Sequence, residues 1–473
     1  MLFREPIVRR RKIHFIGIGG IGMSGIAEIL LNLGYKISGS DLRRSPITDR
    51  LSKMGAAIFE GHAAEHIRGV DVVVYSSAIN EQNPEFASAR EQRIPLIMRG
   101  ELLAELMRLK YGIAIAGSHG KTTTTSITAA VLHQAGLDPT VVVGGRVASL
   151  GSNARLGKSD LLLVEADESD GSFLKLAPII AVITNIDREH MDHYESLHAL
   201  EAAFVEFVDK TPFYGSSIIC IDDPTLRRLM PSMKGQLRTY GSAEQSPDAD
   251  LVVSEVNCRH LASRFRLTLR GRDLGEFEIY SAGRHNVMNA AAAAMVGLEL
   301  DATVDTIRAG LRGFIGVDRR FQVRGERGRV TVIDDYGHHP TEIRATLKAA
   351  RSCDFSKIHV IFQPHRYSRT QLMAGEFATC FADCDRLTLV DIYAASEDPI
   401  PGVNSVELTK KIQQSGHPSA DYQPSTEAAI KSAVLRAEPG DVVVTLGAGN
   451  IWRAGDTILE QLEAKALGVE ART

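Results

Sequence analysis

The sequence contains few cysteines, and their arrangement excludes a fold built on disulfides. Its 473 residues include only five, at positions 220, 258, 353, 380 and 384. Small disulfide-dependent domains carry an even set of closely spaced cysteines. Cys380 and Cys384 are spaced to share one face of a helix, but no second pair accompanies them as in a zinc site. We therefore expect buried free thiols.

Long apolar runs and an excess of one charge are also missing. No uninterrupted apolar stretch reaches the roughly 20 residues that span a bilayer. Lys and Arg number 54 against 58 Asp and Glu, a net charge of −4, so the electrostatic signature of a nucleic-acid binder is absent. The basic Arg9–Lys12 and the apolar residues after it resemble a secretory signal, but Glu28 interrupts the run and no small-residue cleavage site follows. We expect a cytoplasmic protein with no nucleic-acid and no membrane partner.

Short β-branched runs alternate with helix-like stretches along the whole chain. This alternation is typical of parallel sheets covered by helices. Three series of such strands each begin with a fresh strand-then-loop motif, and the length suits about three domains. We therefore predict an α/β protein with domains at 1–107, 108–321 and 322–473. The expected strands include 12–19, 71–78, 111–117, 160–167, 179–187, 216–223, 329–336, 357–364, 386–393 and 441–449.

The first glycine motif indicates a diphosphate site. GIGGIG at Gly17–Gly22 fits the pattern G-x-G-x-x-G, follows an expected strand and opens an expected helix. Glycine permits a tight turn and a close approach to a pyrophosphate, whose charge the helix N-terminus stabilises. Asp41 lies where a ribose-binding acid is expected. On its own the motif fits NAD, FAD and a nucleotide sugar equally well.

A second loop indicates a nucleoside triphosphate. It follows the expected strand 111–117 and precedes a threonine-rich helix, and it comprises Gly117, Ser118, His119, Gly120, Lys121, Thr122 and Thr123. Backbone N–H groups in such a loop cradle phosphate, the lysine reaches the outer phosphates and the first threonine hydroxyl binds Mg²⁺. The usual spacing G-x-x-x-x-G-K-[ST] is not met, because position 115 is Ile115. We interpret the loop as a shortened phosphate-binding loop for ATP.

Acids and histidines follow the neighbouring strands, where Mg²⁺ would need them. Glu165, Asp167, Glu168 and Asp170 follow strand 160–167, and the segment 189–194 (EHMDHY) follows strand 179–187. Ligands bind outside the carboxyl ends of parallel strands, and Mg²⁺ prefers hard oxygen ligands. The H-M-D-H spacing also suggests zinc, but no thiolate accompanies it.

Two further polar strand ends lie in the last third of the chain. Asp334–Pro340 (DDYGHHP) combines acids with two histidines, and Gln363–Thr370 (QPHRYSRT) holds Arg366 and Arg369. Arginine binds carboxylates and phosphates through two parallel hydrogen bonds. We expect these segments to face the same ligands as the phosphate loop.

Taken together and in this order, the motifs resemble those of the Mur ligase family over essentially the whole chain. The resemblance rests on GIGGIGMSG, GSHGKTTT, EADESD, EHMDHY, GRHNVMNA, DRRFQ, DDYGHHPTE and QPHRYSRT. It implies an N-terminal Rossmann-like domain for a UDP-sugar, a central P-loop ATPase with a mostly parallel sheet, and a C-terminal Rossmann-like domain. It further implies that ATP phosphorylates the lactyl carboxylate of UDP-N-acetylmuramate and that the amine of L-alanine attacks the acyl phosphate, a step of peptidoglycan precursor synthesis.

The resemblance also implies roles for particular residues. Lys121, Arg320 and His338 would be catalytic, and Thr122, Glu165 and His190 would hold Mg²⁺. Besides the phosphate loop, the ATP contacts would be His285, Asn289, Arg320 and Asp335. Gly19, Gly20, Ile21, Gly22 and Asp41 would bind the UDP end, and Arg366 and Arg369 the carboxylate of L-alanine.

Three alternatives remain at this point. A related ligase attaches a recycled tripeptide to the same nucleotide sugar, although its glycine pattern usually differs from GIGGIGMSG. An NAD-dependent oxidoreductase would account for the first glycine motif but leaves GSHGKT and EADESD unexplained. A non-catalytic nucleotide-binding regulator would not need the acids and histidines around the phosphate loop.

Overall fold

The computed structural model describes residues 11–76, 78–147, 152–191, 193–417 and 419–468. The chain divides into two compact units. The first comprises Met1–Ser254, Arg266–Gly275 and Met288–Phe314, and the second Glu255–Phe265, Glu276–Val287 and Ile315–Thr473. Among the described residues, each helix is too short or too polar to cross a bilayer.

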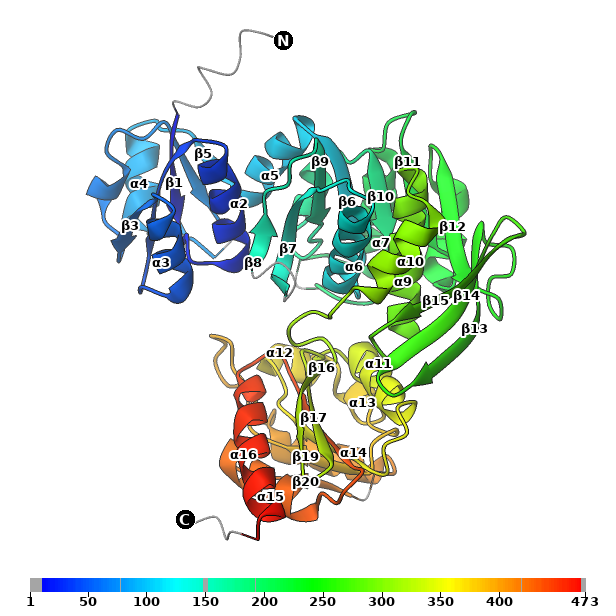
Figure 1. The fold of residues 1–473 in the computed structure, drawn as a ribbon. Helices are drawn as coiled ribbons and strands as arrows, with labels where there is room; N and C mark the ends of the chain where they lie inside the picture. The colour runs from blue at the N-terminus through cyan, green and yellow to red at the C-terminus, as the bar shows by residue number, and fades with distance from the viewer. Residues whose placement is uncertain (1–10, 77, 148–151, 192, 418, 469–473) are drawn as a thin grey trace. The chain divides into compact units, whose positions relative to one another are not determined.

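The first sheet contains five parallel strands in the order β3-β2-β1-β4-β5, with helices on both sides (Figure 1). The strands are β1 (Lys12–Ile16), β2 (Lys36–Asp41), β3 (Ala57–Glu60), β4 (Val72–Tyr75) and β5 (Leu96–Met98). The helices are α2 (Ile21–Asn32), α3 (Pro46–Lys53), η1 (Ala64–Ile67), α4 (Pro84–Glu91) and α5 (Arg99–Arg108). Because the chain runs outward from β1 to β3 and then returns to β4, the strand order reverses beside β1. Open α/β sheets bind ligands at such a reversal.

The second sheet has ten strands in the order β15-β14-β13-β12-β11-β10-β6-β9-β7-β8. Strand β6 (Tyr111–Ala116) lies between β9 (Leu161–Glu165) and β10 (Ile180–Ile183) and is parallel to both. The other strands are β7 (Thr140–Val147), β8 (Ser152–Arg155), β11 (Ser216–Cys220), β12 (Leu237–Ser242), β13 (Leu251–Arg259), β14 (Ala262–Leu269) and β15 (Arg272–Ile279). The helices are α6 (Lys121–Gln134), η3 (Ser172–Lys175), α7 (Leu197–Asp209), α8 (Pro224–Leu229), η4 (Met230–Ser232), α9 (Arg284–Glu299) and α10 (Val304–Arg312).

The third sheet has six strands in the order β16-β17-β21-β18-β19-β20, and only β16 is antiparallel to its neighbour. The strands are β16 (Gln322–Arg327), β17 (Val330–Asp335), β18 (Ile358–Phe362), β19 (Arg386–Leu389), β20 (Ala420–Tyr422) and β21 (Val442–Leu446). The helices are α11 (Pro340–Arg351), α12 (Tyr367–Leu372), α13 (Ala374–Phe377), α14 (Ser405–Gln414), α15 (Thr426–Arg436), η5 (Ile451–Arg453) and α16 (Ala454–Ala466).

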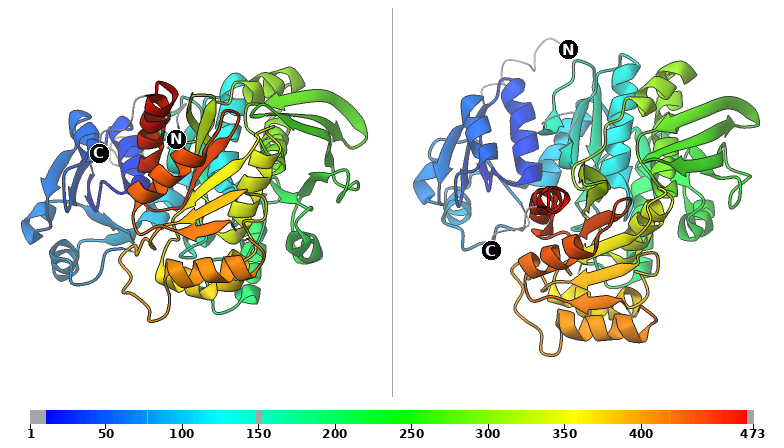
Figure 2. Two further views of the ribbon diagram at one scale, coloured as in Figure 1. Left: turned by 90° about the horizontal axis from the view of Figure 1, so that it is seen from below. Right: turned by 60° about the horizontal axis from the view of Figure 1, so that its bottom comes forward.

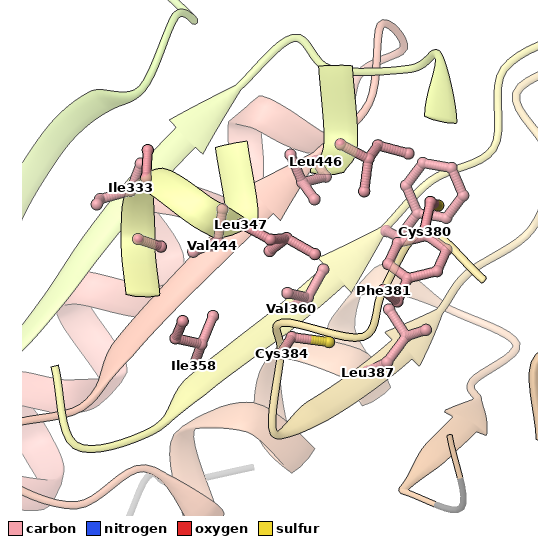
Figure 3. Packing of buried hydrophobic residues seen from close by; sticks show 14 of the residues in the cluster. Ile333, Leu347, Ile358, Val360, Cys380, Phe381, Cys384, Leu387, Val444 and Leu446 are labelled. Carbon is pink, nitrogen blue, oxygen red and sulfur yellow. The ribbon is translucent and has the colours of Figure 1, made fainter. Parts of the chain in front are cut away.

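This third sheet is apolar on both faces. Val444 and Leu446 of β21 pack with Leu347 of α11 on one face (Figure 3), whereas the intervening Val443 packs on the other face with Ile458 of α16. Helices α15 and α16 therefore cover one face and α11 and α14 the other (Figure 2). Burial of each such side chain stabilises the fold by about 1.5–3 kcal/mol. Because both faces of the sheet are covered, successive residues of each strand are apolar and the strands appear in the sequence as continuous apolar runs.

The expected fold class is confirmed, and each expected strand has a counterpart. Each of these strands ends one to four residues before its expected carboxyl end. Thus β6 ends at Ala116 and β21 at Leu446, because Gly117 and Gly447 have φ of +128° and +142°, outside the extended region. The strands that were not predicted are β2, β3, β5, β7, β8, β12, β13, β14, β15, β16 and β20.

Candidate active site

The loop between β6 and α6 needs glycine at two positions. Gly117 has φ of +128° and Gly120, which caps α6, has φ of +82°. A Cβ on Gly117 would lie 2.1 Å from Oγ1 of Thr184, and one on Gly120 would lie 2.6 Å from Oδ1 of Asn289. The loop therefore has no room for larger residues at these points and opens directly into the N-terminus of α6, where the helix favours an anion.

Lys121 begins α6 and its ammonium group lies inside this loop. Nζ donates hydrogen bonds to the carbonyl oxygens of Gly117 (2.7 Å) and Ser118 (3.1 Å) and to Oε1 of Glu168 (2.8 Å). Although burial opposes the charged form, Glu168 raises the pKa of Lys121 to about 12. Burial raises the pKa of Glu168 itself to about 7, and the nearby ammonium only partly offsets this. The loop thus holds a charged lysine paired with a buried carboxyl group.

The expected metal ligands gather beside the same loop. The hydroxyl of Thr122 donates to Oε1 of Glu165 at the end of β9 (2.8 Å). Glu168, Glu189 and His190 each offer a ligand atom, and these atoms all lie within 4.8 Å of one another. His190 adopts φ of +56°, and its Nε2 lies 3.7 Å from Oε1 of Glu168. A hydroxyl and a carboxylate are oxygen donors that suit Mg²⁺, so the residues present fit this ion. Asp192 lies outside the described residues.

The residues that follow β10 fix the shape of the phosphate loop. Asn185 accepts from the backbone N–H of His119 (2.8 Å) and donates from Nδ2 to the carbonyl oxygen of the same residue (3.0 Å). Asp187 binds Nε2 of His119 (2.9 Å), and its backbone N–H donates to the hydroxyl of Ser118 (2.8 Å). Polar side chains at this strand end were anticipated, but their bracing role was not. The segment TNID carries no local signal for this role, because the partners of Asn185 and Asp187 lie 66 and 69 residues away in the chain.

Two residues expected to contact adenine fall in different units. Asn289 of α9 belongs to the first unit and lies against Gly120, as described above. His285 belongs to the second unit, where burial and the charge of Arg320 lower its pKa to about 4. The imidazole of His285 is therefore neutral at pH 7.

Arg320 and Asp335 lie together in the second unit. Burial raises the pKa of Asp335 to about 6, opposed by Arg320 and by hydrogen bonds from the backbone N–H groups of Phe321 (2.6 Å) and Gly337 (2.7 Å). Arg320 lies 3.3 Å from Oε1 of Glu342, and its guanidinium is 5.1 Å from the centre of the Tyr336 ring. Glu342 and Tyr336 were not singled out in the sequence, although both belong to the motif that carries Asp335.

The two arginines expected to bind the amino acid lie beside a pair of histidines. Nη1 of Arg369 is 3.5 Å from Nδ1 of His365, and the rings of His365 and His338 are 6.0 Å apart. Burial, and then the charges of its neighbours, lowers the pKa of His365 to about 4. Arg366 adopts φ of +70° and donates its backbone N–H to the carbonyl oxygen of Tyr393 (2.9 Å). The second unit thus presents cationic groups together at the carboxyl ends of β17 and β18.

The glycine motif of the first sheet forms a turn between β1 and α2. The backbone N–H groups of Gly17 and Ile18 donate to the carbonyl oxygen of Ser40 (2.8 and 2.9 Å), and that of Gly19 donates to Oδ2 of Asp41 (2.8 Å). A Cβ on Gly19 would lie 2.7 Å from the same oxygen. Asp41 therefore lies beside the turn, as expected, and holds its backbone. Gly20 caps α2 and Ile21 begins it.

A glycine turn on one parallel sheet and a phosphate loop with a lysine on the next define a nucleotide-binding α/β protein. Three family models match the chain in order: the catalytic domain of the Mur ligase family over residues 12–111, the Mur ligase middle domain over 115–297, and the glutamate ligase domain of Mur ligases over 319–449. The chain belongs to the Mur ligase family.

Individual proteins resemble the chain over nearly its whole length. UDP-N-acetylmuramate–L-alanine ligase from Solibacter usitatus is 58% identical over 98% of this chain and 98% of its own. The protein with the same description from Koribacter versatilis is 55% identical over 97% and 99%. Among solved structures, UDP-N-acetylmuramate–alanine ligase from Thermotoga maritima has a TM-score of 0.80 and 28% identity, covering 96% of this chain and 99% of that one.

Proposed function

We propose that this chain joins L-alanine to the lactyl carboxylate of UDP-N-acetylmuramate, with conversion of ATP to ADP and phosphate. A carboxylate oxygen attacks the γ-phosphorus of ATP, ADP leaves, and an acyl phosphate forms. The amine of L-alanine then attacks the acyl carbon, loses a proton and expels phosphate. Phosphorylation is needed because a free carboxylate has only oxide as a leaving group. The high identity to proteins described as L-alanine ligases supports this choice.

In the first unit, Lys121 stabilises charge on the phosphoryl group during transfer. The contacts of its ammonium with loop carbonyls and Glu168 support this role, because they place the charge inside the phosphate loop. Thr122, Glu165 and His190 would hold Mg²⁺, which supplies further charge neutralisation for the phosphates. Asn185 already accepts the backbone N–H groups of Ser118 and His119, so the N–H groups at the start of α6, including that of Thr123, contact the phosphate oxygens.

By their motif, His285, which is a neutral imidazole, and Asn289 are the adenine contacts. Arg320 and Asp335 contribute to ATP binding at the carboxyl end of β17. Arg366 and Arg369 bind the carboxylate of L-alanine, and His338 lies close enough to their neighbour His365 to act on the same substrate. We further propose that the three domains span residues 1–107, 108–321 and 322–473, and that the protein works in the cytoplasm, where ATP is supplied.

The observation that carries the proposal is the charged lysine inside a loop that admits only glycine at two positions. The test measures phosphate release from ATP with UDP-N-acetylmuramate and L-alanine, together and each omitted. Release should require both substrates, and chelation of Mg²⁺ should abolish it. Equal release without an amino acid would refute amide synthesis. Faster turnover with a tripeptide than with L-alanine would instead favour the recycling ligase.

A further inference from the structure

A buried carboxylate beside the first sheet is surrounded by three histidines that the proposed chemistry does not use. Glu85, in the first turn of α4, has a side chain that is 0% exposed. Its Oε1 accepts from Nδ1 of His66 (2.7 Å), and its Oε2 accepts from the hydroxyl of Ser40 (2.5 Å) and from Nδ1 of His62 (3.0 Å). Nε2 of the fully buried His14 lies 3.6 Å from Oε1.

This arrangement fixes which nitrogen of His62 carries the proton. An ionised carboxylate only accepts hydrogen bonds, and the single hydroxyl proton of Ser40 is directed to Glu85. Both neighbours of Nδ1 of His62, Oε2 of Glu85 and Oγ of Ser40 (3.0 Å), are therefore acceptors. Nδ1 must carry hydrogen, so in the neutral ring Nε2 is a hydrogen-bond acceptor. Among the described residues, the hydrogen bonds of the His62 ring all involve Nδ1, and the side chain is 14% exposed, which leaves Nε2 available to a ligand.

His62 is also adjacent to the glycine turn. Its Nδ1 contacts the side-chain hydroxyl of Ser40. The backbone carbonyl oxygen of Ser40 accepts hydrogen bonds from the N–H groups of Gly17 and Ile18. Gly61 donates its backbone N–H to the carbonyl oxygen of Asp41 (2.7 Å), which places His62 just past the carboxyl end of β3. Ligands of parallel sheets bind at this edge. His66, by contrast, stacks on Phe59 with ring centres 4.3 Å apart and serves to brace the carboxylate.

We propose that His62 accepts a hydrogen bond from a donor group of the uridine, either a ribose hydroxyl or the uracil N3–H, and that Glu85 is the positioning residue that sets its tautomer. This inference rests on the proposed function, because it assigns a contact within the nucleotide-sugar site. It adds a recognition element that neither the glycine motif nor Asp41 supplies, since those bind phosphate or hold the backbone.

The test measures affinities of the full-length protein for UDP and for 2′-deoxy, 3′-deoxy and N3-methyl UDP by calorimetry. In the wild type, the analogue that lacks the relevant donor should bind about tenfold more weakly than UDP, since an unpaired polar group remains. The identity of that analogue distinguishes ribose from uracil recognition. In the variants His62→Ala and Glu85→Gln, the same analogue should bind less than about twofold more weakly than UDP. ATP affinity should be unchanged in both variants.

Glu81→Gln is the matched control, because Glu81 lies near Glu85 in the chain but its side chain is 74% exposed and forms an ion pair with Arg90 at the surface. It should keep the tenfold discrimination. If Glu85→Gln does not fold, the partly exposed His62→Ala carries the test alone. Discrimination retained in His62→Ala would overturn the inference while leaving the proposed function intact. Absence of UDP binding by the wild type would overturn both.

Discussion

Replacing Gly117 by alanine should damage the phosphate loop more than a loss of glycine flexibility explains. The added Cβ would meet Oγ1 of Thr184 at 2.1 Å and the backbone nitrogens of Thr184 and Asn185 at 3.0 and 3.1 Å. Because φ is +128°, backbone strain adds about 1–3 kcal/mol, and forcing atoms into a packed site adds about 1–3 kcal/mol more. We expect a total destabilisation of about 2–6 kcal/mol.

Gly136 offers a matched control just beyond the same helix. Its φ is +77°, but no atom lies within 4 Å of a built Cβ. Gly136→Ala should therefore lower the free energy of unfolding by the cost of backbone strain alone, about 1–2 kcal/mol. The comparison separates steric conflict from conformational strain, since both variants make the same chemical change.

Two measurements decide the outcome. Urea unfolding of both variants should show the larger loss for Gly117→Ala, and calorimetric titration should show ATP affinity reduced at least about tenfold for that variant only. Displacing Thr184 disturbs its 2.6 Å hydrogen bond to the carbonyl oxygen of His119, and small misplacements of a loop reduce function strongly. Equal destabilisation by the two substitutions, or unchanged ATP affinity in Gly117→Ala, would refute this reasoning.

Three further outcomes are expected. Lys121→Ala should lower kcat at least about a hundredfold while UDP affinity, measured by calorimetry, stays at the wild-type value; a weaker UDP complex would contradict the assignment of the two nucleotides to different sheets. Arg366→Ala should raise KM for L-alanine about tenfold or more with little change in kcat, and an unchanged KM would remove its carboxylate-binding role. Burial opposes ionisation of Glu85, yet His14 and Ser40 hold its pKa at about 2, below the ordinary 4.5. Because the pKa of Glu85 is lower in the folded state, its ionised carboxylate adds about 3 kcal/mol to the free energy of unfolding above pH 4.5, and this contribution is lost as the pH falls toward 2. Urea unfolding across this range should show that Glu85→Gln loses less stability in acid than the wild type does.

The sequence predicts the surroundings of the phosphate loop well because they follow from strand order. Thr122 follows β6, Glu165 ends β9 and His190 follows β10, and these three strands are adjacent and parallel. Carboxyl ends of adjacent parallel strands meet at one edge, so recognising each strand end suffices. The sequence does not reveal that Glu165 binds Thr122 while Glu168 binds Lys121, since both acids belong to one motif and their partners depend on the path of the chain after β9.

The cluster around Glu85 could not be predicted from sequence for a different reason. His14 lies within β1, His62 follows β3, His66 lies in η1 and Glu85 in α4, so no spacing links them. Each looks like an isolated polar residue until the sheet and its helices bring them together. Buried polar groups require complete sets of partners, and such a set is a property of the tertiary structure.

Asp41 has a structural role that the motif spacing did not predict. The motif spacing indicates a ligand contact, yet its carboxylate accepts the N–H of Gly19, while Ser40 accepts those of Gly17 and Ile18. These three N–H groups are therefore already hydrogen-bonded to residues at the end of β2. The N–H of Gly20 donates to the carbonyl oxygen of Gly17. The first N–H groups of a helix have no partner within it, so the amides at the start of α2 would be the donors for the diphosphate of the proposed UDP-sugar site. In the proposed nucleotide-sugar site the glycines would serve mainly to let the ligand approach, and the helix that follows them would stabilise its charge.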